Sequence, residues 1–302
     1  MARLDLVLME RNPGFSRSRI EGLVKAGYVT VNGAAASKAG MKVAEDDEIE
    51  MEVPPPVPAV PEPEDIPLDI VYEDEDMIVV DKPPGMVVHP APGHFTGTLV
   101  NALLGHCPGL GGIGGVSRPG IVHRLDMDTS GLVAAAKSQR AMDALAKAFA
   151  SHSAVEKTYL AICHGRPRLD AGRIENLIGR HPVDRKRMAI VERNGKRAAT
   201  RWRVLDGAAN DGRVCAVECR IETGRTHQIR VHMASLGCPV AGDAVYGKSA
   251  LDKRLSPPPA RQLLHAWRLS LRHPATGAPM SFVAPPPRDL AAFLKNPGDF
   301  ET

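Results

Sequence analysis

The sequence predicts an α+β protein in which a mostly antiparallel sheet follows a small α/β module. Three observations support this prediction. From residue 66 onward, short β-rich segments alternate with turn residues, and few stretches there have helical periodicity. Residues 54–67 hold seven prolines in fourteen positions, which is typical of a semi-stiff extended linker. Many strands joined by hairpins, with few helices, favour an α+β fold.

The N-terminal module is predicted to contain two helices and a hairpin. Residues 3–10 and 16–26 are the helix candidates. In the second of these, Ser18 and Glu21 have the spacing of a capping box. Asn32-Gly33 follows a short alternating strand and is the strongest short signal for a hairpin turn.

The larger domain is expected to be a sheet with two helices. Its strand candidates are residues 70–72, 77–80, 86–88, 132–136, 157–163, 200–205 and 213–221, and its helix candidates are residues 98–104 and 141–149. The expected boundaries are 1–53 for the module, 54–67 for the proline-rich linker and 68–302 for the larger domain. A proline-rich linker would leave the module free to reorient.

The composition is that of a globular protein without a membrane span. The 302 residues are 43% hydrophobic and 24% charged, and no apolar run reaches the length of a membrane span. The five cysteines include no Cys-x-x-Cys pair, which favours a reducing cytoplasm. Net charge is only +3, but residues 166–230 carry sixteen Lys and Arg against eight Asp and Glu. This excess favours a polyanionic partner, and a basic surface without a partner is the alternative.

A glycine-rich stretch over residues 109–114 satisfies the pattern G-x-G-x-x-G. It follows Cys107-Pro108 rather than a strand and precedes no helix candidate. A dinucleotide site requires a strand, a glycine turn and a helix in that order. We therefore expect a flexible loop here and no nucleotide cofactor.

The densest polar cluster lies between two apolar segments, over residues 120–132. It contains His123, Arg124, Asp126, Asp128, Thr129 and Ser130. Because the apolar segments would hold these side chains on rigid backbone, the cluster is a candidate active site. The alternative is a turn whose aspartates cap local backbone N–H groups.

This cluster resembles the catalytic motif of the RluA family of pseudouridine synthases, through His123-Arg124-Leu125-Asp126 and Asp128-Thr129-Ser130-Gly131. Other motifs of that family recur in order: residues 81–85 with Val88-His89, residues 157–161, residues 223–232, and then Gly242-Asp243 and Tyr246-Gly247. The resemblance covers nearly all of residues 66–290 and implies the bent mixed sheet of these enzymes. Met127 departs from the Lys that S4-bearing relatives often have at this position.

The N-terminal module resembles an S4 RNA-binding domain, through residues 16–19 and 31–33. This resemblance implies that Arg17 and Arg19 contact RNA phosphates, which positions an RNA without reading its bases. A solvated helix face is the alternative for these charges. Together the two resemblances imply an enzyme that isomerises specific uridines to pseudouridine in large-subunit (23S) ribosomal RNA.

The resemblance also implies three catalytic residues. Asp126 would act at the ribose, either as nucleophile at C1′ or as base at C2′. Arg230 would pair with this carboxylate, keeping it ionised and aimed, unless it is a surface arginine that contacts phosphate. Tyr159 would stack on the uracil and could take the C5 proton, unless it is a core tyrosine. Asp128 is the rival acid, because two residues apart on a strand the aspartates would share a face.

Further residues are expected to bind the RNA, from which the target uridine must be everted. The candidates are His123, Arg124, Arg225, His227, Ile229, Arg180, Arg185 and Lys186, besides Arg17 and Arg19. Core packing is an equal alternative for Ile229, and a solvated loop is one for the basic residues at 180–187. His123, His227 and His232 lack acidic or cysteine partners at ligand spacing, so no metal is expected.

The expected partner is ribosomal RNA, either free or in a large-subunit precursor particle. We expect no membrane, no cofactor and a monomeric protein. Three alternatives stay open: a tRNA-directed synthase with the same chemistry, a non-catalytic RNA-binding ribosome-assembly factor, and a glycosidase that uses Asp126 and Asp128.

Overall fold

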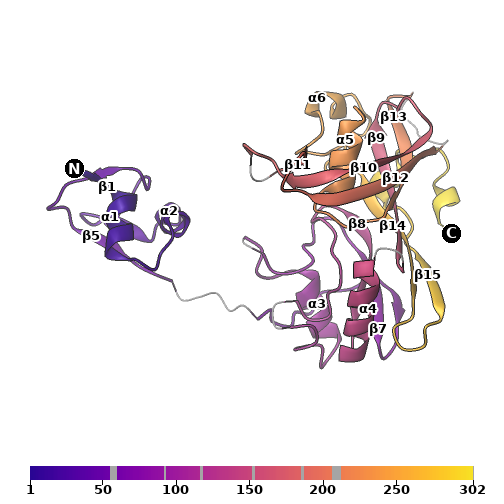
Figure 1. Cartoon of the computed structure of the whole chain (residues 1–302), viewed down its shortest axis with the longest axis horizontal. Helices are drawn as coiled ribbons and strands as arrows, with labels where there is room; N and C mark the ends of the chain where they lie inside the picture. The colour runs from indigo at the N-terminus through magenta and orange to yellow at the C-terminus, as the bar shows by residue number, and fades with distance from the viewer. Residues whose placement is uncertain are drawn as a thin grey trace. The chain divides into compact units, whose positions relative to one another are not determined.

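The structure, a computed structural model, describes residues 1–54, 60–91, 93–115, 118–151, 154–184, 187–205 and 212–301. The chain forms two compact units, Met1–Ala59 and Val60–Thr302 (Figure 1). Among the described residues, no helix is both long enough and apolar enough to cross a membrane.

The first unit consists of two helices and short strands around a small apolar core. Its elements are β1 (Ala2–Arg3), α1 (Leu4–Arg11), α2 (Arg17–Lys25), β2 (Val29–Val31), β3 (Ala34–Ala35), β4 (Lys42–Val43) and β5 (Ile49–Met51). Leu4 and Leu8 of α1 are buried in one cluster with Ile20 of α2. Asn32 and Gly33 join β2 to β3 with φ of 52° and 76°, the positive values that a two-residue hairpin turn requires. The predicted helices and hairpin are confirmed.

The N-cap of α2 differs from the prediction. Ser16 caps the helix, because its side chain accepts a hydrogen bond from the backbone N–H of Arg19. Ser18 lies inside the first turn, so the capping box predicted for Ser18 and Glu21 was wrong. The Glu21 carboxylate lies instead 3.4 Å from Nε of Arg17.

The second unit is built on one ten-stranded sheet. Its strands are β6 (Ile70–Glu73), β7 (Met77–Lys82), β8 (Ser130–Ala136), β9 (Glu156–His164), β10 (Ala171–Arg180), β11 (Met188–Val191), β12 (Lys196–Leu205), β13 (Val214–Ile221), β14 (Leu264–Arg272) and β15 (Pro279–Val283). Their order is β11-β10-β12-β13-β9-β14-β8-β7-β6, with β15 paired to β14. The pairings of these strands are antiparallel except that of β14 with β8. The predicted α+β class is confirmed, whereas β10, β11, β14 and β15 were not predicted.

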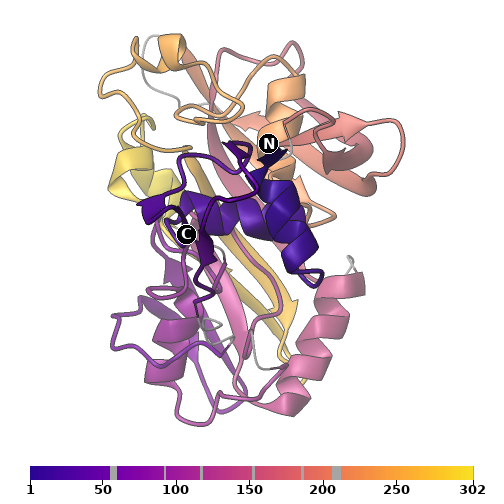
Figure 2. The same cartoon turned by 90° about the vertical axis from the view of Figure 1, so that its left-hand side faces the viewer.

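Helices cover both faces of the sheet. They are α3 (Leu99–His106), α4 (Gln139–Ser151), α5 (Gln228–Ser235), α6 (Ser249–Asp252) and α7 (Arg288–Ala291), with a 3₁₀ turn η1 (Pro297–Phe300). Figure 2 shows α3 and α4 on opposite sides of the strands between them. Side-chain alternation along β7 explains this arrangement. Ile78 belongs to the apolar cluster that includes α3, whereas Met77 and Val79 belong to the cluster that includes α4.

The parallel pairing of β14 with β8 joins two halves of the sheet. It spans two residue pairs, His265 with Ser130 and Ala266 with Gly131. Gly131 has a φ of 112°, and a Cβ there would overlap the backbone of Ala266. Glycine is therefore required where the polar cluster of the sequence passes into β8.

Residues 86–88 do not form the predicted strand. Their carbonyl groups are used at the start of α3: the N–H of Leu99 bonds to O of Val87 at 2.9 Å, and that of Val100 to O of Val88 at 3.0 Å. The first N–H groups of a helix have no partner within the helix. Residues 87 and 88 supply acceptors for two of these N–H groups. The segment therefore runs past the N-terminal end of α3 instead of pairing with a neighbouring strand.

The second half of the proline-rich segment packs on α3. The side-chain amide of Asn101 donates to O of Glu62 at 2.8 Å, and the N–H of Glu64 donates to O of Asn101 at 3.0 Å. The Glu64 carboxylate accepts a bond from the N–H of Gly97 at 3.0 Å. Residues 62–64 thus belong to the second unit, although they lie in the range predicted as linker.

Candidate active site

Asp126 lies in the turn that leads into β8. The backbone N–H of Thr129 bonds to O of Asp126 at 3.1 Å, and Leu125 and Thr129 are buried. The carboxylate remains 19% exposed, so it is open to a substrate. Because Asp126 and Asp128 lie in a turn, the expectation that they share a strand face was wrong.

Arg230 of α5 bridges two carboxylates. Its Nη1 donates to Oδ2 of Asp126 at 3.0 Å, while Nε and Nη2 donate to the two oxygens of Asp243 at 2.7 and 2.9 Å. Arg230 and Asp243 are both buried. Burial opposes the charge of Arg230, but the bonds and charge of Asp243, with those of Asp126, raise its pKa above the ordinary value. The guanidinium is therefore fixed by Asp243 and aimed at Asp126.

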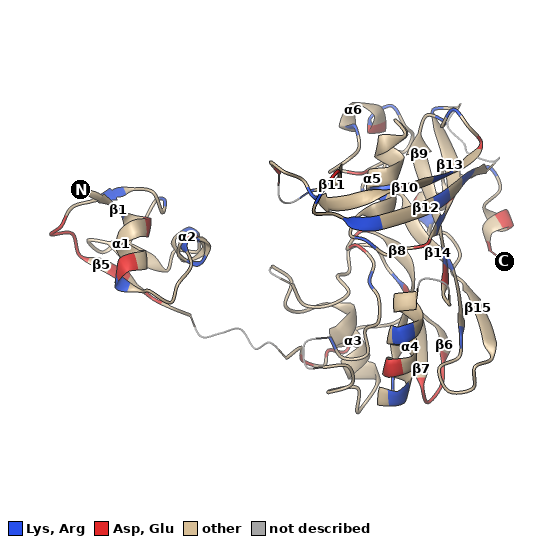
Figure 3. Cartoon of the chain, viewed as in Figure 1, with Lys and Arg blue, Asp and Glu red and all other residues tan. Residues whose placement is uncertain are grey.

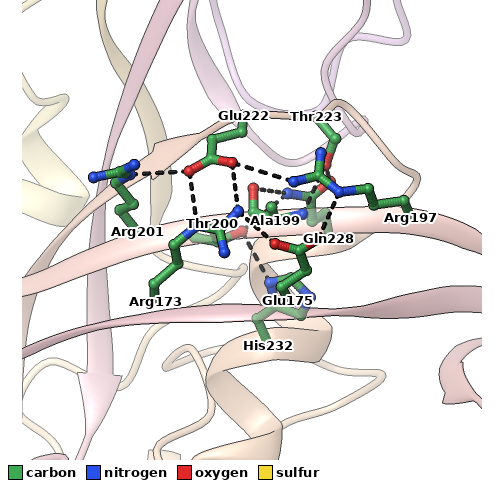
Figure 4. A network of polar contacts seen from close by, with 10 residues as sticks. All are labelled: Arg173, Glu175, Arg197, Ala199, Thr200, Arg201, Glu222, Thr223, Gln228 and His232. Atoms are coloured by element: carbon green, nitrogen blue, oxygen red, sulfur yellow. Dashed lines mark hydrogen bonds and ion pairs between the residues drawn. The ribbon is translucent and has the colours of Figure 1, made fainter.

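The start of α5 is bonded to β12 through a buried network (Figure 4). The side-chain nitrogen of Gln228 donates to O of Ala199 at 3.0 Å and to Oγ1 of Thr200 at 2.9 Å. Its oxygen accepts a bond from the hydroxyl of Thr223 at 2.7 Å. One turn further along α5, Nδ1 of His232 lies 2.9 Å from Oγ1 of Thr200. This network fixes the helix turn that carries Arg230.

Asp126, Arg230 and Tyr159 line one cleft. Its other lining residues are Arg124, Leu125, Thr129, Ile221, Gly224, Arg225, Thr226, His227, Gln228, Ile229 and Leu264. Tyr159, on β9, is 7% exposed. Burial, together with the charge of Asp126, raises the pKa of Tyr159, so its hydroxyl keeps its proton at neutral pH. A cleft with apolar walls and one acid suits a flat ring attached to a sugar.

His227 stands beside the acid at the N-terminal end of α5. Its Nε2 lies 3.9 Å from Oδ2 of Asp126, and its Nδ1 lies 2.9 Å from Oη of Tyr246. The Tyr246 oxygen also accepts the N–H of Met188 at 2.8 Å. Burial lowers the pKa of His227, so we expect a neutral imidazole held by Tyr246. In the sequence, Tyr246 is recognisable only as part of the motif Tyr246-Gly247.

Arg124, Arg225 and Ile229 all line the cleft. Arg124 is exposed, and Arg225 is anchored by its Nε to O of Arg197 at 2.8 Å. Ile229 is 4% exposed and also belongs to the largest apolar cluster. Ile229 therefore combines both alternatives, cleft wall and core packing.

His123 has a structural contact that its motif did not predict. Its Nε2 accepts the backbone N–H of Ala134 at 2.9 Å, and its ring stacks on Phe149 at 4.4 Å. Burial, with the nearby charge of Lys157, lowers the pKa of His123 to about 3. The ring is therefore a neutral acceptor for β8, at the edge of a hollow next to the cleft.

Arg17 and Arg19, which were predicted to contact RNA phosphates, both contact side chains of the first unit. Nε of Arg17 donates to Asp5 at 2.9 Å, and Asp5 is fully buried. The guanidinium of Arg19 lies 4.0 Å above the ring of Phe15. Arg17 is nevertheless half exposed, so one side of its guanidinium faces solvent.

Arg180 is not among the residues that line the cleft. Arg180 is exposed at the end of β10, and Arg185 and Lys186 lie outside the described residues. Both ring nitrogens of His232 are hydrogen-bonded, to Thr200 and Asn176. In the described part of the chain, a metal-compatible group forms at Glu73, His106 and Cys107, but Lys137 bonds to its carboxylate at 2.6 Å.

Lys82 contacts the turn that carries Asp126, although it is recognisable in the sequence only as part of a motif. It is fully buried, and its Nζ donates to the carbonyl oxygens of Pro83, Met86 and Met127 at 2.6, 2.9 and 3.0 Å. Burial lowers the pKa of Lys82 to about 7, while the charge of Asp128 opposes this shift. Because Met127 follows Asp126, the ammonium group ties the acid's turn to the end of β7.

Replacing Lys82 by Met is expected to lower kcat by more than about tenfold, since small displacements of a catalytic group are costly.

Lys82→Met should also change how the free energy of unfolding depends on pH. The folded-state pKa is lowered, so between pH 7 and 10 the unfolded chain binds more protons, and stability rises with pH in that window. Urea unfolding at pH 7 and 9.5 should show a smaller rise for Lys82→Met than for the unmodified protein. Equal rises would contradict this assignment.

Comparison with known proteins adds independent information. Residues 76–235 match the family described as RNA pseudouridylate synthase, and residues 2–49 match the S4 domain family. The chain is 46% identical to ribosomal large subunit pseudouridine synthase D of Zymomonas mobilis, over 97% of this chain and 93% of the relative. It is also 46% identical to the uncharacterized RNA pseudouridine synthase YlyB of Bacillus subtilis, with the same coverage. The solved structure of human RNA pseudouridylate synthase domain containing 1 is 29% identical, covers 76% of this chain and 88% of that one, and has a TM-score of 0.60.

Proposed function

This chain belongs to the RNA pseudouridylate synthase family, and from that premise we propose that its cleft is where a uridine of RNA becomes pseudouridine. In this isomerisation the C1′–N1 bond breaks, the uracil turns, and C5 bonds to C1′. The observation that carries the proposal is the position of Asp126, 3.0 Å from Arg230 in a cleft shared with Tyr159.

Asp126 is the group that acts on the ribose. Arg230 aims the carboxylate, and Asp243 in turn fixes Arg230. An aimed carboxylate can attack C1′ or remove the C2′ proton, and both roles require the same place beside the sugar. The apolar side chains that line the cleft hold the freed uracil while it turns.

Tyr159 stacks on the uracil and handles the proton that leaves C5. Its hydroxyl is protonated, because burial raises its pKa. It can therefore accept the C5 proton only while it passes its own proton to a base, and the Asp126 carboxylate lines the same cleft. One proton leaves C5 and one is gained at N1, so the reaction needs no outside reagent. His227 and Arg225 then contact the RNA around the everted nucleotide.

Large-subunit ribosomal RNA is the substrate that we propose. The relative from Zymomonas mobilis carries this substrate in its name and matches nearly the whole chain. Residues 1–53 would bind RNA as the S4 domain, and the second unit, Val60–Thr302, would catalyse. The protein would act as a cytoplasmic monomer, on free RNA or on a large-subunit precursor particle.

Tritium release tests this proposal. Transcripts of large-subunit ribosomal RNA and of a tRNA pool, labelled with tritium at C5 of uridine, are incubated with the purified protein. We expect release from the ribosomal transcript in a whole-number ratio to RNA, and pseudouridine at fixed positions. Release from tRNA instead would support the tRNA-directed alternative. Binding without release from either transcript would support a non-catalytic assembly factor.

A further inference from the structure

His227 has an unusual backbone conformation at the edge of the cleft. It is the N-cap of α5, with a φ of 56° and a ψ of 19°, the left-handed region that residues with a Cβ rarely adopt. Its side chain makes no capping bond to α5. A residue persists in this conformation where its surroundings hold it, and such residues gather at functional sites. The imidazole is thus directed at the cleft, which it lines, and not at the N–H groups of the helix.

Tyr246 fixes the imidazole and selects its tautomer. Oη of Tyr246 lies 2.9 Å from Nδ1 of His227 and accepts the backbone N–H of Met188 at 2.8 Å. The N–H of Met188 can only donate, so of these two partners only Nδ1 can accept the phenolic proton. Burial lowers the pKa of His227, which favours the neutral ring. In a neutral ring with Nδ1 as acceptor, Nε2 carries the hydrogen.

The Nε2–H group of His227 faces the catalytic acid across a gap. Nε2 lies 3.9 Å from Oδ2 of Asp126, which is beyond hydrogen-bond distance. Among the residues that the structure describes, no other group bonds to Nε2. The side chain of His227 is only 20% exposed, and an N–H group without a partner is costly in such a place. The gap therefore points to a hydrogen-bond acceptor on the substrate.

The other polar side chains at the start of α5 are already bonded within the protein. Helix α5 is largely uncharged, and Arg230 is its one Lys or Arg (Figure 3). The guanidinium of Arg230 is bonded to Asp243 and Asp126. The side chain of Gln228 is bonded to β12 and to Thr223. His227 is therefore the side chain here that keeps a neutral donor for the substrate.

We propose that His227 is a further catalytic residue, whose Nε2–H donates a hydrogen bond to O2 of the target uracil, and that Tyr246 is its positioning residue. The inference rests on the proposed function, because it requires the uridine beside Asp126. O2 is bonded to the ring carbon next to N1, so it is the base oxygen nearest the ribose carbon C1′.

The hydrogen bond would act when the C1′–N1 bond breaks. In both roles proposed for Asp126, the bonding electrons leave with the uracil, and the negative charge spreads from N1 to O2. A donor that is in place before this charge develops stabilises the transition state. The hydrogen stays on Nε2 throughout, so His227 gains and loses no proton.

The same donor can serve the uracil after it has turned. A half-turn about the line through N3 and C6 exchanges N1 with C5 and O2 with O4. Once C5 faces C1′, O4 therefore lies where O2 lay, and Nε2–H of His227 can donate to it without moving. Cytosine has an amino group in place of O4, so its turned ring would place one donor against another. His227 would thus favour uracil over cytosine.

The first test compares two variants of His227. His227→Leu removes the donor, whereas His227→Gln keeps an N–H group near the position of Nε2, and both lose the bond to Tyr246. At saturating ribosomal transcript, tritium release should be about 10²-fold slower for the Leu variant than for the unmodified protein, since loss of one such donor has an effect of this size. The Gln variant should recover part of the rate. KM, and the affinity for a fluorescein-labelled oligouridylate measured by anisotropy, should change little.

The second test changes the acceptor. 2-Thiouridine at a modified position of the transcript replaces O2 by sulfur, which is a weaker acceptor. The sulfur should slow the unmodified protein about tenfold more than it slows the Leu variant, the size of one hydrogen bond to a charged group. This coupling would be absent if His227 had only a structural role. An equal effect of sulfur on both proteins overturns the proposal, as do equal rates of the Leu and Gln variants.

Tyr246→Phe tests the positioning of the imidazole. Phe keeps the ring on which the guanidinium of Arg230 lies, 5.2 Å from the ring centre, but removes the hydroxyl that selects the tautomer. The rate at saturating RNA should fall and the effect of sulfur should shrink, while KM stays unchanged. A Phe variant with the rate and the sulfur effect of the unmodified protein overturns the role of Tyr246.

His106→Leu is the matched control. It makes the same change at a histidine of α3 that is 39% exposed and is not among the residues that line the cleft. It should leave the rate and the effect of sulfur unchanged. Failure of the proposed function would appear separately, as absent tritium release from the unmodified protein on every transcript.

Discussion

Pseudouridine formation is expected to fall at least about 10³-fold when Asp126 is replaced by Asn, because removal of a nucleophile or general base has effects of this size or larger. The fold should survive, since Arg230 keeps both of its bonds to Asp243. Affinity for RNA should change little, because the amide has nearly the same shape as the carboxylate. Single-turnover tritium release and oligouridylate binding, measured on the same preparation, check both statements.

Asp128→Asn is the matched control for this prediction. It changes the neighbouring aspartate by the same single atom, but Asp128 is not among the residues that line the cleft. More than a tenth of the activity should remain. Activity that survives in the Asp126 variant and disappears in the Asp128 variant would reverse the assignment of the acid.

Removal of Asp243 is expected to affect both stability and catalysis. Asp243→Ala leaves the buried guanidinium of Arg230 with one of its three bonds, and loss of one partner of a buried ion pair costs about 3 kcal/mol or more. Without Asp243, Arg230 no longer aims at Asp126, so kcat should fall about 10²-fold even where the protein is folded. Denaturant unfolding and tritium release measure the two effects.

Asp243→Asn provides a graded comparison. Its side-chain oxygen can still accept the backbone N–H groups of Val245 and Tyr246, which Oδ1 of Asp243 accepts at 2.8 and 3.0 Å. Only the charge and one guanidinium bond are lost, so Asp243→Asn should fall between the Ala variant and the unmodified protein. If the Ala variant is folded and fully active, Asp243 has no role in aiming Arg230.

The sequence singled out Asp126, Arg230 and Tyr159 through motifs, and these residues line one cleft. It could not find the roles of Asp243 and Lys82. Asp243 acts through contact with a helix thirteen residues earlier, which depends on how the intervening loop folds. Lysines are rarely buried, so a lysine beside two prolines is read as part of an exposed turn. Three carbonyl partners become visible only when the chain is folded.

Some strands could be predicted from the sequence and others could not. Strands with continuous apolar runs, such as β7 and β8, were predicted because buried strands have this pattern. β10 was not predicted, since charged residues such as Arg173 and Glu175 alternate along it. These two residues pair with each other within β10, and Glu175 also pairs with Arg197 of β12. Residues 86–88 have a strand's composition but serve the start of α3, a choice that depends on tertiary contact.

The parallel contact between β14 and β8 joins the two halves of the sheet close to Asp126. Gly131 lies against Ala266 there, only five positions after Asp126. We expect separation of the two halves of the sheet to break the bond between the Asp126 carboxylate and Arg230 as well. Under the proposed function, a protein opened at this contact should therefore lose pseudouridine formation before the rest of the fold is lost.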